Sequence, residues 1–186
     1  MKAIILIVSF LWFLPAGVRA FDLEVGVHKS RPQFGYRLQT YKGPNSTLTF
    51  KPSGQGTIAG QSQSVGLGFD HLLVELEQTK YRAHILMLDA QGSSTLLYPQ
   101  YTQSRMGFFY REERELAGFF LGVGLERYSD QFVYAGQEFK NSGDTAYFKV
   151  GLELIFSALR VRVDQVDSKL GKYNLKTNSM GVLFRF

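Results

Sequence analysis

Short segments in which apolar and polar residues alternate follow one another along most of the chain. In residues 21–28 every second residue is apolar, and the residues between them are polar or glycine. A period of two predicts a β-strand with two different faces, because successive side chains of a strand point in opposite directions. Eight such segments cover residues 21–28, 64–69, 72–77, 105–110, 119–126, 147–156, 159–164 and 181–186. The pattern therefore predicts an all-β protein with eight antiparallel strands.

The composition of the two faces separates a membrane protein from a water-soluble one. Alternation alone also fits a soluble sandwich, with its apolar face turned inward. Here the polar face is rich in glycine and in charges of both signs, while the apolar face is rich in Phe and several segments end in an aromatic residue. An up-and-down transmembrane β-barrel has an outer apolar band, aromatic residues at both interfaces and a polar interior. We therefore predict such a barrel, with the apolar face toward lipid.

The connections between the predicted strands have two lengths. Three are short: Asp70-His71, residues 112–115 and Ser157-Ala158. The other four cover residues 31–57, 82–100, 128–144 and 168–177. Because outer-membrane barrels have short periplasmic turns and longer extracellular loops, this difference predicts which end of the barrel faces outward.

The first long connection leaves the strand number open between eight and ten. Residues 34–38 alternate, and a turn signal at residues 43–46 precedes Leu48 and Phe50. This segment is either a hairpin above the membrane or two further spanning strands. Residues 48–50 form only a short run before Pro52, so eight strands are favoured.

The first twenty residues predict a secretory signal peptide. Lys2 precedes an apolar stretch over residues 3–14, and Val18-Arg19-Ala20 offers small residues at the two positions read by a signal peptidase. The apolar stretch is too short for a membrane-spanning helix, which leaves an uncleaved anchor as the alternative. We therefore expect a cleaved signal over residues 1–20 and a barrel domain over residues 21–186.

Composition narrows the chemistry. The 186 residues include 16 Phe, 10 Tyr and 19 Gly, but no Cys and only three His, so neither a thiolate site nor a histidine-rich metal centre is expected, and no cofactor is predicted. The formal net charge is +5. Basic residues in the predicted loops are too scattered among acids for nucleic-acid binding, but they suit lipopolysaccharide phosphates. These bases are Arg31, Arg37, Lys42, Lys51, Lys169, Lys172 and Lys176.

The last eight residues carry the most specific motif. A polar residue, a glycine and two aromatic residues stand at fixed spacing up to the final position, as Ser179, Gly181, Phe184 and Phe186. This pattern resembles the assembly signal of bacterial outer-membrane proteins, which implies a bacterial outer-membrane location and recognition by the barrel assembly machinery through added strand pairing. The rest of the chain resembles the small eight-stranded OmpA/OmpX-type barrels in length, strand count and loop asymmetry. This resemblance implies a monomer.

The alternation places charges of both signs on the inward face. An eight-stranded barrel is just wide enough for side chains to fill it, so these charges are expected to pair with one another. A two-residue turn at Ser157-Ala158 sets Glu153 opposite Arg162, and Arg185 is expected to meet Asp22 or Glu24. The alternative is a narrow ion path. The predicted lumen network is Glu24, Glu75, Arg105, Glu126, Lys149, Glu153, Arg160, Arg162, Asp164 and Arg185.

A three-residue match raises an enzymatic alternative. His28-Lys29-Ser30 has the His-x-Ser spacing of lipid A deacylases, which resemble this chain in size. It departs from that family because it lies on the first predicted strand and because His28 falls on the inward face. We therefore predict a non-enzymatic protein with a plugged polar interior and a structural or surface-interaction role through its extracellular loops. A narrow pore and a lipid A-modifying enzyme remain the alternatives.

Overall fold

A computed structural model describes residues 22–34, 39–43, 47–88, 94–98, 100–170 and 173–186 of the chain. The predicted signal peptide, residues 1–20, lies outside the described residues. The strands are β1 (Asp22–Phe34), β2 (Gln39–Lys42), β3 (Thr47–Phe69), β4 (Leu72–Leu88), β5 (Ser94–Leu97), β6 (Gln100–Glu113), β7 (Ala117–Tyr134), β8 (Gln137–Phe156), β9 (Leu159–Leu170) and β10 (Tyr173–Arg185). No helix that is long and apolar enough to cross a membrane occurs in this part of the chain.

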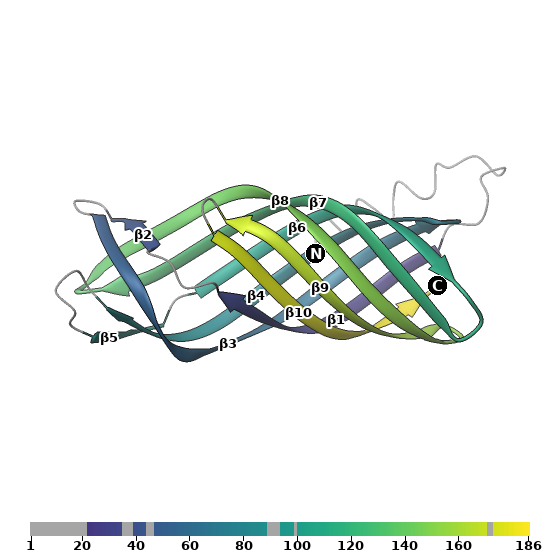
Figure 1. Ribbon diagram of the computed structural model, residues 1–186, viewed down its shortest axis with the longest axis horizontal. Coiled ribbons are helices and arrows are strands. Elements are labelled where there is room, and N and C mark those ends of the chain that lie inside the picture. The colour runs from purple at the N-terminus through teal and green to yellow at the C-terminus, as the bar shows by residue number, and fades with distance from the viewer. Residues whose placement is uncertain (1–21, 35–38, 44–46, 89–93, 99, 171–172) are drawn as a thin grey trace.

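Eight long strands close into an antiparallel barrel (Figure 1). Each pairs with its neighbour in the order β3-β1-β10-β9-β8-β7-β6-β4, and β4 pairs with β3 to complete the circle. The first and last strands pair from Glu24↔Arg185 to Phe34↔Leu175. In the closed part of the wall each strand has a paired neighbour on both sides, so the backbone groups there are satisfied by one another. Beyond it, residues 137–146 of β8 pair with β7 and, at Lys140, with β2. The predicted eight-stranded up-and-down barrel is confirmed.

Two short strands lie at the end of the barrel opposite to the C-terminus (Figure 1). Strand β2 pairs with the beginning of β3, from Gln39↔Phe50 to Lys42↔Thr47, and β5 pairs with the end of β4. Strands β2 and β3 therefore form a hairpin that extends this end of the barrel, and residues 44–46 of the predicted turn lie outside the described residues. It does not add two strands to the wall, because the circle closes with eight.

The strands continue well past the predicted segments, so all four predicted long loops are in large part strand. Most of residues 31–57 belong to β1, β2 and β3, and most of residues 82–100 belong to β4 and β5. Residues 128–144 form the outer halves of β7 and β8, joined by a two-residue turn at Ala135-Gly136 where both residues have positive φ. Most of residues 168–177 likewise belong to β9 and β10. In these outer halves both faces of the strand are largely polar, so apolar alternation disappears although backbone pairing continues. The short turns at Asp70-His71 and Ser157-Ala158 lie where predicted.

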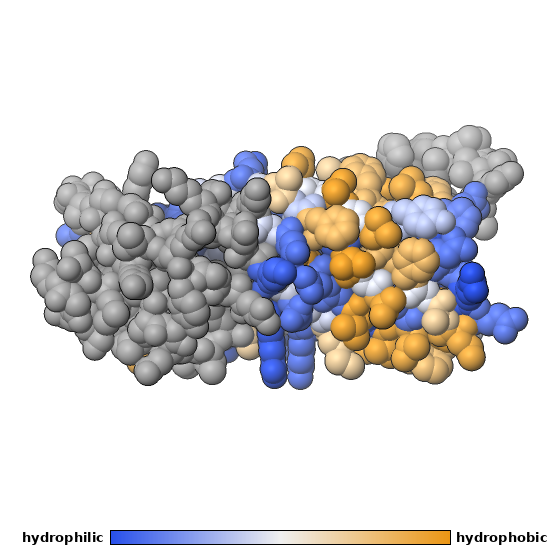
Figure 2. All heavy atoms as spheres, viewed as in Figure 1, coloured by the Kyte–Doolittle hydropathy of each residue, from blue (hydrophilic) through white to orange (hydrophobic). Residues whose placement is uncertain are grey.

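The outer wall carries a zone of exposed apolar side chains, bordered by hydrophilic residues (Figure 2). Phe108 on β6, Leu152 on β8 and Val27 on β1 are 52%, 67% and 60% exposed. Exposed apolar surface on this scale marks contact with lipid or a partner. The apolar face of the alternation therefore points outward.

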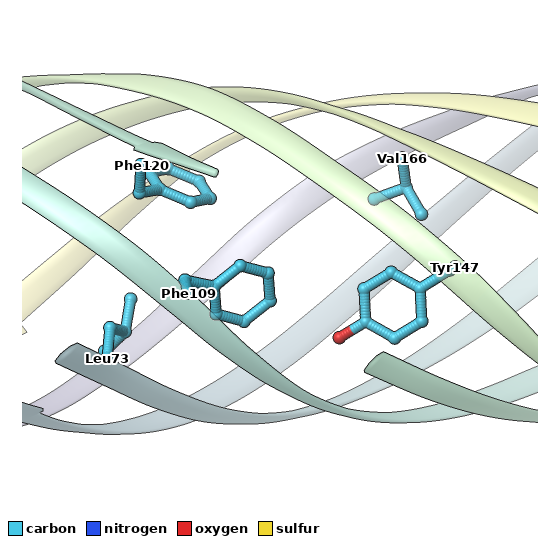
Figure 3. Close-up of a cluster of buried hydrophobic side chains, with 5 residues drawn as sticks. All are labelled: Leu73, Phe109, Phe120, Tyr147 and Val166. Carbon is cyan, nitrogen blue, oxygen red and sulfur yellow. The ribbon is translucent and has the colours of Figure 1, made fainter. Parts of the chain in front are cut away.

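The interior is not purely polar, which corrects the sequence-based expectation. One buried cluster unites side chains from five strands: Leu73, Phe109, Phe120, Tyr147 and Val166 (Figure 3). The ring centroids of Phe109 and Phe120 are 5.8 Å apart with the rings perpendicular, which is a favourable aromatic arrangement.

Several lumen-facing glycines accommodate these rings. A Cβ on Gly151 would overlap the Phe120 ring, and a Cβ on Gly124 would lie 2.6 Å from Tyr147 Cε1. Gly68 is different, because a Cβ there would meet the Arg111 guanidinium. Two of these three glycines therefore make room for aromatic rings and one for a charged side chain.

Candidate functional site: the charged lumen

Charged side chains from seven strands meet in the lumen beside the aromatic cluster. The inward-facing positions of β1, β4, β6, β7, β8 and β9 supply six carboxylates and five bases, none more than 5% exposed. The carboxylates are Glu24, Glu75, Glu77, Glu126, Glu153 and Asp164, and the bases are Arg105, Arg111, Lys149, Arg160 and Arg162. Half-exposed Arg185 on β10 adds a base near the C-terminal end. Such a burial of charge is tolerable only if the groups pair and hydrogen-bond.

Arg162 contacts three carboxylates, on β1, β4 and β8. Its Nη2 lies 2.6 Å from Glu153 Oε1 and 3.4 Å from Glu24 Oε2, and its Nη1 contacts Glu75. The register places Glu153 directly opposite Arg162, as the two-residue turn at Ser157-Ala158 requires. The guanidinium carbon also lies 4.5 Å from the centroid of the Phe120 ring, so the charge stacks on the aromatic cluster.

Lys149 joins the carboxylates of β4 to that of β9. Its Nζ donates hydrogen bonds of 2.6 Å to Glu75 and 3.1 Å to Glu77, and it lies 3.8 Å from Asp164 Oδ2. The same ammonium group is 5.8 Å from the centroids of both Phe109 and Phe120. A single cation therefore connects three strands across the lumen.

Arg105 extends the network toward the β2–β5 end. Its Nε donates a 2.7 Å hydrogen bond to Glu126, which faces it in the register, and its Nη1 lies 3.6 Å from Glu77. Gln103 bridges this pair to two tyrosines: it donates to Glu126 and to the Tyr101 hydroxyl, and it accepts a hydrogen bond from Tyr81.

Glu113 forms ion pairs with three arginines at the C-terminal end of the lumen. Its carboxylate is 2.6 Å from Arg160 Nη1, 2.8 Å from Arg111 Nε and 2.9 Å from Arg185 Nη1. Arg185 also contacts Asp22, which joins the last strand to the first. The network thus extends across the seam where β1 and β10 meet.

The structure brings all ten predicted lumen residues to the inside of the barrel and into shared ion pairs. It adds Glu77, Arg111 and Glu113, which the sequence reasoning missed. Glu77 has the inward phase of Glu75 and could have been included. Arg111 and Glu113 lie beyond the predicted end of their strand at Tyr110. Only the longer strand β6 shows that both side chains face the lumen.

His28 and Ser30 of the His-x-Ser match form hydrogen bonds with different partners and not with each other. His28 Nε2 forms a 2.9 Å hydrogen bond with Ser64 Oγ, whereas Ser30 Oγ bonds to Ser62 and Ser179. His28 Nδ1 is buried and has no hydrogen-bond partner among the described residues, so no carboxylate orients the imidazole as a catalytic base requires. Within this part of the chain, no three His, Cys, Asp or Glu side chains are placed to hold a metal ion.

The four residues of the C-terminal motif lie on or directly after β10. Ser179 and Gly181 face the lumen and are buried, whereas Phe184 and Phe186 are 52% and 76% exposed on the outer wall. The Phe186 backbone pairs with Leu23 through hydrogen bonds of 2.9 and 3.2 Å.

No protein-family profile matches the sequence, and no curated protein matches it significantly. Solved structures do match. OprG of Pseudomonas aeruginosa superposes with a TM-score of 0.63 at 10% identity, covering 91% of this chain and 98% of that one. Ail of Yersinia pestis, solved with the heparin analogue sucrose octasulfate, gives 0.59 at 14% identity, covering 90% and 100%. Neisserial surface protein A gives 0.59 at 11% identity, covering 89% and 97%.

Proposed function

Because the chain has the fold of the small eight-stranded barrels of the bacterial outer membrane, we propose that it spans that membrane as a monomer with a filled lumen. It acts through its outer surface and not as a pore or a catalyst. One observation carries this proposal: eleven charged side chains, none more than 5% exposed, lie in the lumen, and ion pairs and hydrogen bonds connect them across it. The exposed apolar zone supports the membrane location, since closed barrels satisfy their backbone within lipid.

Three layers of paired polar side chains fill the lumen from the C-terminal end to the β2–β5 end. At the C-terminal end, Glu113 binds three arginines. The central layer consists of Arg162, Lys149 and their carboxylates beside the aromatic cluster. Beyond it, Arg105 and Gln103 connect to the tyrosines. An ion that entered would have to separate buried paired charges, which costs several kcal/mol, on the order of 3–5 for a broken buried pair.

A planar-bilayer experiment tests the filled lumen. We expect the wild-type protein to show no stable conductance. The double variant Glu153→Ala/Arg162→Ala removes one acid and one base, keeps the net charge and opens space in the central layer, so it is expected to conduct. A stable wild-type conductance that the double variant leaves unchanged would refute the proposal and favour the narrow pore.

A surface role is supported by the end of the barrel that carries β2 and β5. We propose that this end faces outward, because the C-terminus and the connections predicted to be periplasmic lie at the other end. The structurally similar Ail was solved with a polyanionic heparin analogue, which supports recognition of anionic ligands at such surfaces. Lipopolysaccharide phosphates are the anions present at this interface.

Catalysis is not part of the proposal. The inward burial of His28 and its bond to Ser64 keep the imidazole away from lipid substrates. We expect Ser30→Ala to leave the acylation of lipid A unchanged in cells that express the protein. Loss of a deacylated lipid A species in that variant would establish the enzyme instead.

A further inference from the structure

Four exposed basic side chains stand on the outer wall around strand β3. Lys29 and Arg31 lie on β1, and Lys80 and Arg82 lie on β4. Lys29 pairs with Gln61 of β3, and Gln61 pairs in turn with Lys80, so these three residues form one cross-strand row. Two residues farther along β3, Ala59 pairs with Arg82. We call Lys29, Arg31, Lys80 and Arg82 the basic patch.

The basic patch differs from the other outward-facing bases of the wall in its neighbours. Arg127 lies opposite Asp144 at 2.8 Å, and Lys176 lies opposite Asp167 at 4.0 Å. In the patch, the cross-strand positions hold only uncharged residues, namely Ala59, Gln61, Gln100, Thr102, Asn178 and Met180. No carboxylate of the described residues lies within ion-pair distance of any of its four bases. The patch therefore has four positive charges that the described wall does not neutralise.

A surface concavity lies within the patch. Its volume is about 680 Å³, and its lining includes the four bases together with Gln61 and Gln63. The amides offer hydrogen-bond donors between the two pairs of bases. Because β1 and β4 are separated by one strand, the two pairs stand about 10 Å apart, which is twice the spacing between neighbouring strands. The site therefore suits two anionic groups, one for each pair.

The patch adjoins the apolar zone on one side. In the row beyond Lys29 stand Val27 and Gln63, and the next row pairs Val25 with Val65 and Val65 with Leu76. Val27 is 60% exposed. A ligand that places its anionic groups on the patch thus has apolar wall directly beneath them for acyl chains.

We propose that this patch is a binding site for a diphosphorylated, acylated glycolipid of the outer leaflet. Each pair of bases binds one phosphate, and the acyl chains lie along the apolar wall of β1, β3 and β4. This site rests on the proposed outer-membrane location, and it deepens the surface role by assigning it to one side of the barrel. Of the bases predicted to contact lipopolysaccharide, only Arg31 belongs to the patch. Lys176 is paired with Asp167, Arg37 and Lys172 lie outside the described residues, and the side chains of Lys42, Lys51 and Lys169 are not described.

Binding of diphosphoryl lipid A to the full barrel in neutral detergent tests this site, with native mass spectrometry as the readout. Lys29→Gln/Lys80→Gln is compared with Arg127→Gln/Lys176→Gln, which removes the same charge from the paired side of the wall. A base near an anionic headgroup contributes about a factor of five in affinity, so the patch variant is expected to bind about 30-fold more weakly. The control variant is expected to bind as wild type does. Arg31→Gln/Arg82→Gln provides a second patch variant, and heat-modifiable electrophoretic mobility verifies that each one folds.

Two further probes identify the occupant. Monophosphoryl lipid A is expected to bind more weakly than the diphosphorylated lipid, and sucrose octasulfate, which has no acyl chains, is expected to bind more weakly than either lipid. Equal losses in the patch and control variants would overturn the site. A sucrose octasulfate affinity equal to that of the lipid would overturn the lipid as its occupant. Neither result depends on the conductance experiment, so failure of this site and failure of the filled lumen are distinguishable.

Discussion

Replacing Arg162 with Met removes a fully buried charge from the centre of the lumen while keeping most of the side-chain volume. Arg162 is 0% exposed, contacts the carboxylates of Glu24, Glu75 and Glu153, and stacks on Phe120. Removal of one member of a buried ion pair costs about 3–5 kcal/mol, because the partner stays buried without its counter-charge. Each of the three carboxylates keeps another base, as Glu153 keeps Arg160 at 2.8 Å. We therefore expect the lower end of this range, about 3 kcal/mol.

Equilibrium unfolding in urea, with the barrel refolded into lipid vesicles, measures this loss. Trp12 is the only tryptophan and precedes the described barrel, so circular dichroism and heat-modifiable mobility follow the transition instead of tryptophan fluorescence. Arg127→Met is the matched control, because it removes the same group from an ion pair whose side chains are 79% and 65% exposed. Such exposed pairs contribute little to stability, so the control is expected to unfold as wild type does. An Arg162→Met barrel that is no less stable than Arg127→Met would refute the reasoning that the lumen charges stabilise one another.

Three other predictions concern a lumen-facing glycine, the Glu153–Arg162 ion pair and assembly. Gly122→Ala is expected to lower the unfolding free energy by about 1–3 kcal/mol or more, because its Cβ would overlap the Phe108 carbonyl oxygen and lie 2.7 Å from Phe109 Cα. Gly66→Ala, whose Cβ would lie 3.0 Å from the Leu73 side chain, is expected to lower it less in the same urea titration. A double-mutant cycle on Glu153→Gln and Arg162→Gln is expected to give a coupling in unfolding free energy of about 0.5–3 kcal/mol. A coupling of similar size between Glu153→Gln and Arg105→Gln would contradict the pairing of Glu153 with Arg162. Phe186→Ala is expected to reduce the heat-modifiable barrel recovered from outer membranes, whereas Val163→Ala, an exposed apolar position outside the C-terminal motif, is expected to leave it unchanged.

The wall of the barrel was predictable from the sequence because lipid and lumen impose opposite demands on successive residues. Phe108 must face lipid and Arg105 cannot, so the alternation shows which residues of each membrane-spanning segment face outward and which face the lumen. Glu153 and Arg162 could be paired in advance, since a two-residue turn leaves only one register. Apolar alternation thus supplied both the strand number and the inward charges.

Two features escaped the same reasoning for physical reasons. In residues 128–144 only Asp130, Phe132 and Phe139 are buried, and they stand among polar residues, so no apolar alternation distinguishes a ladder from a loop. The aromatic cluster was missed because Phe109 and Phe120 stand in runs where both faces are apolar, and the charged neighbours suggested a polar interior. The basic patch was also not apparent, since its rows arise from pairing between residues that are far apart in the sequence, such as Lys29 and Lys80 through Gln61.

The long β7–β8 hairpin holds the turn at its tip at a defined height above the rest of the barrel. From Leu125, the last exposed apolar residue before the polar half of β7, nine further residues lead to Tyr134. At about 3.4 Å per residue this is about 30 Å of strand, and a tilt near 40° leaves roughly 23 Å of height. Paired backbone along this length holds the Ala135-Gly136 turn stiffly away from the bilayer. A peptide inserted at this turn would be displayed on a rigid stalk, at a height set by the strand and not by the length of a flexible linker.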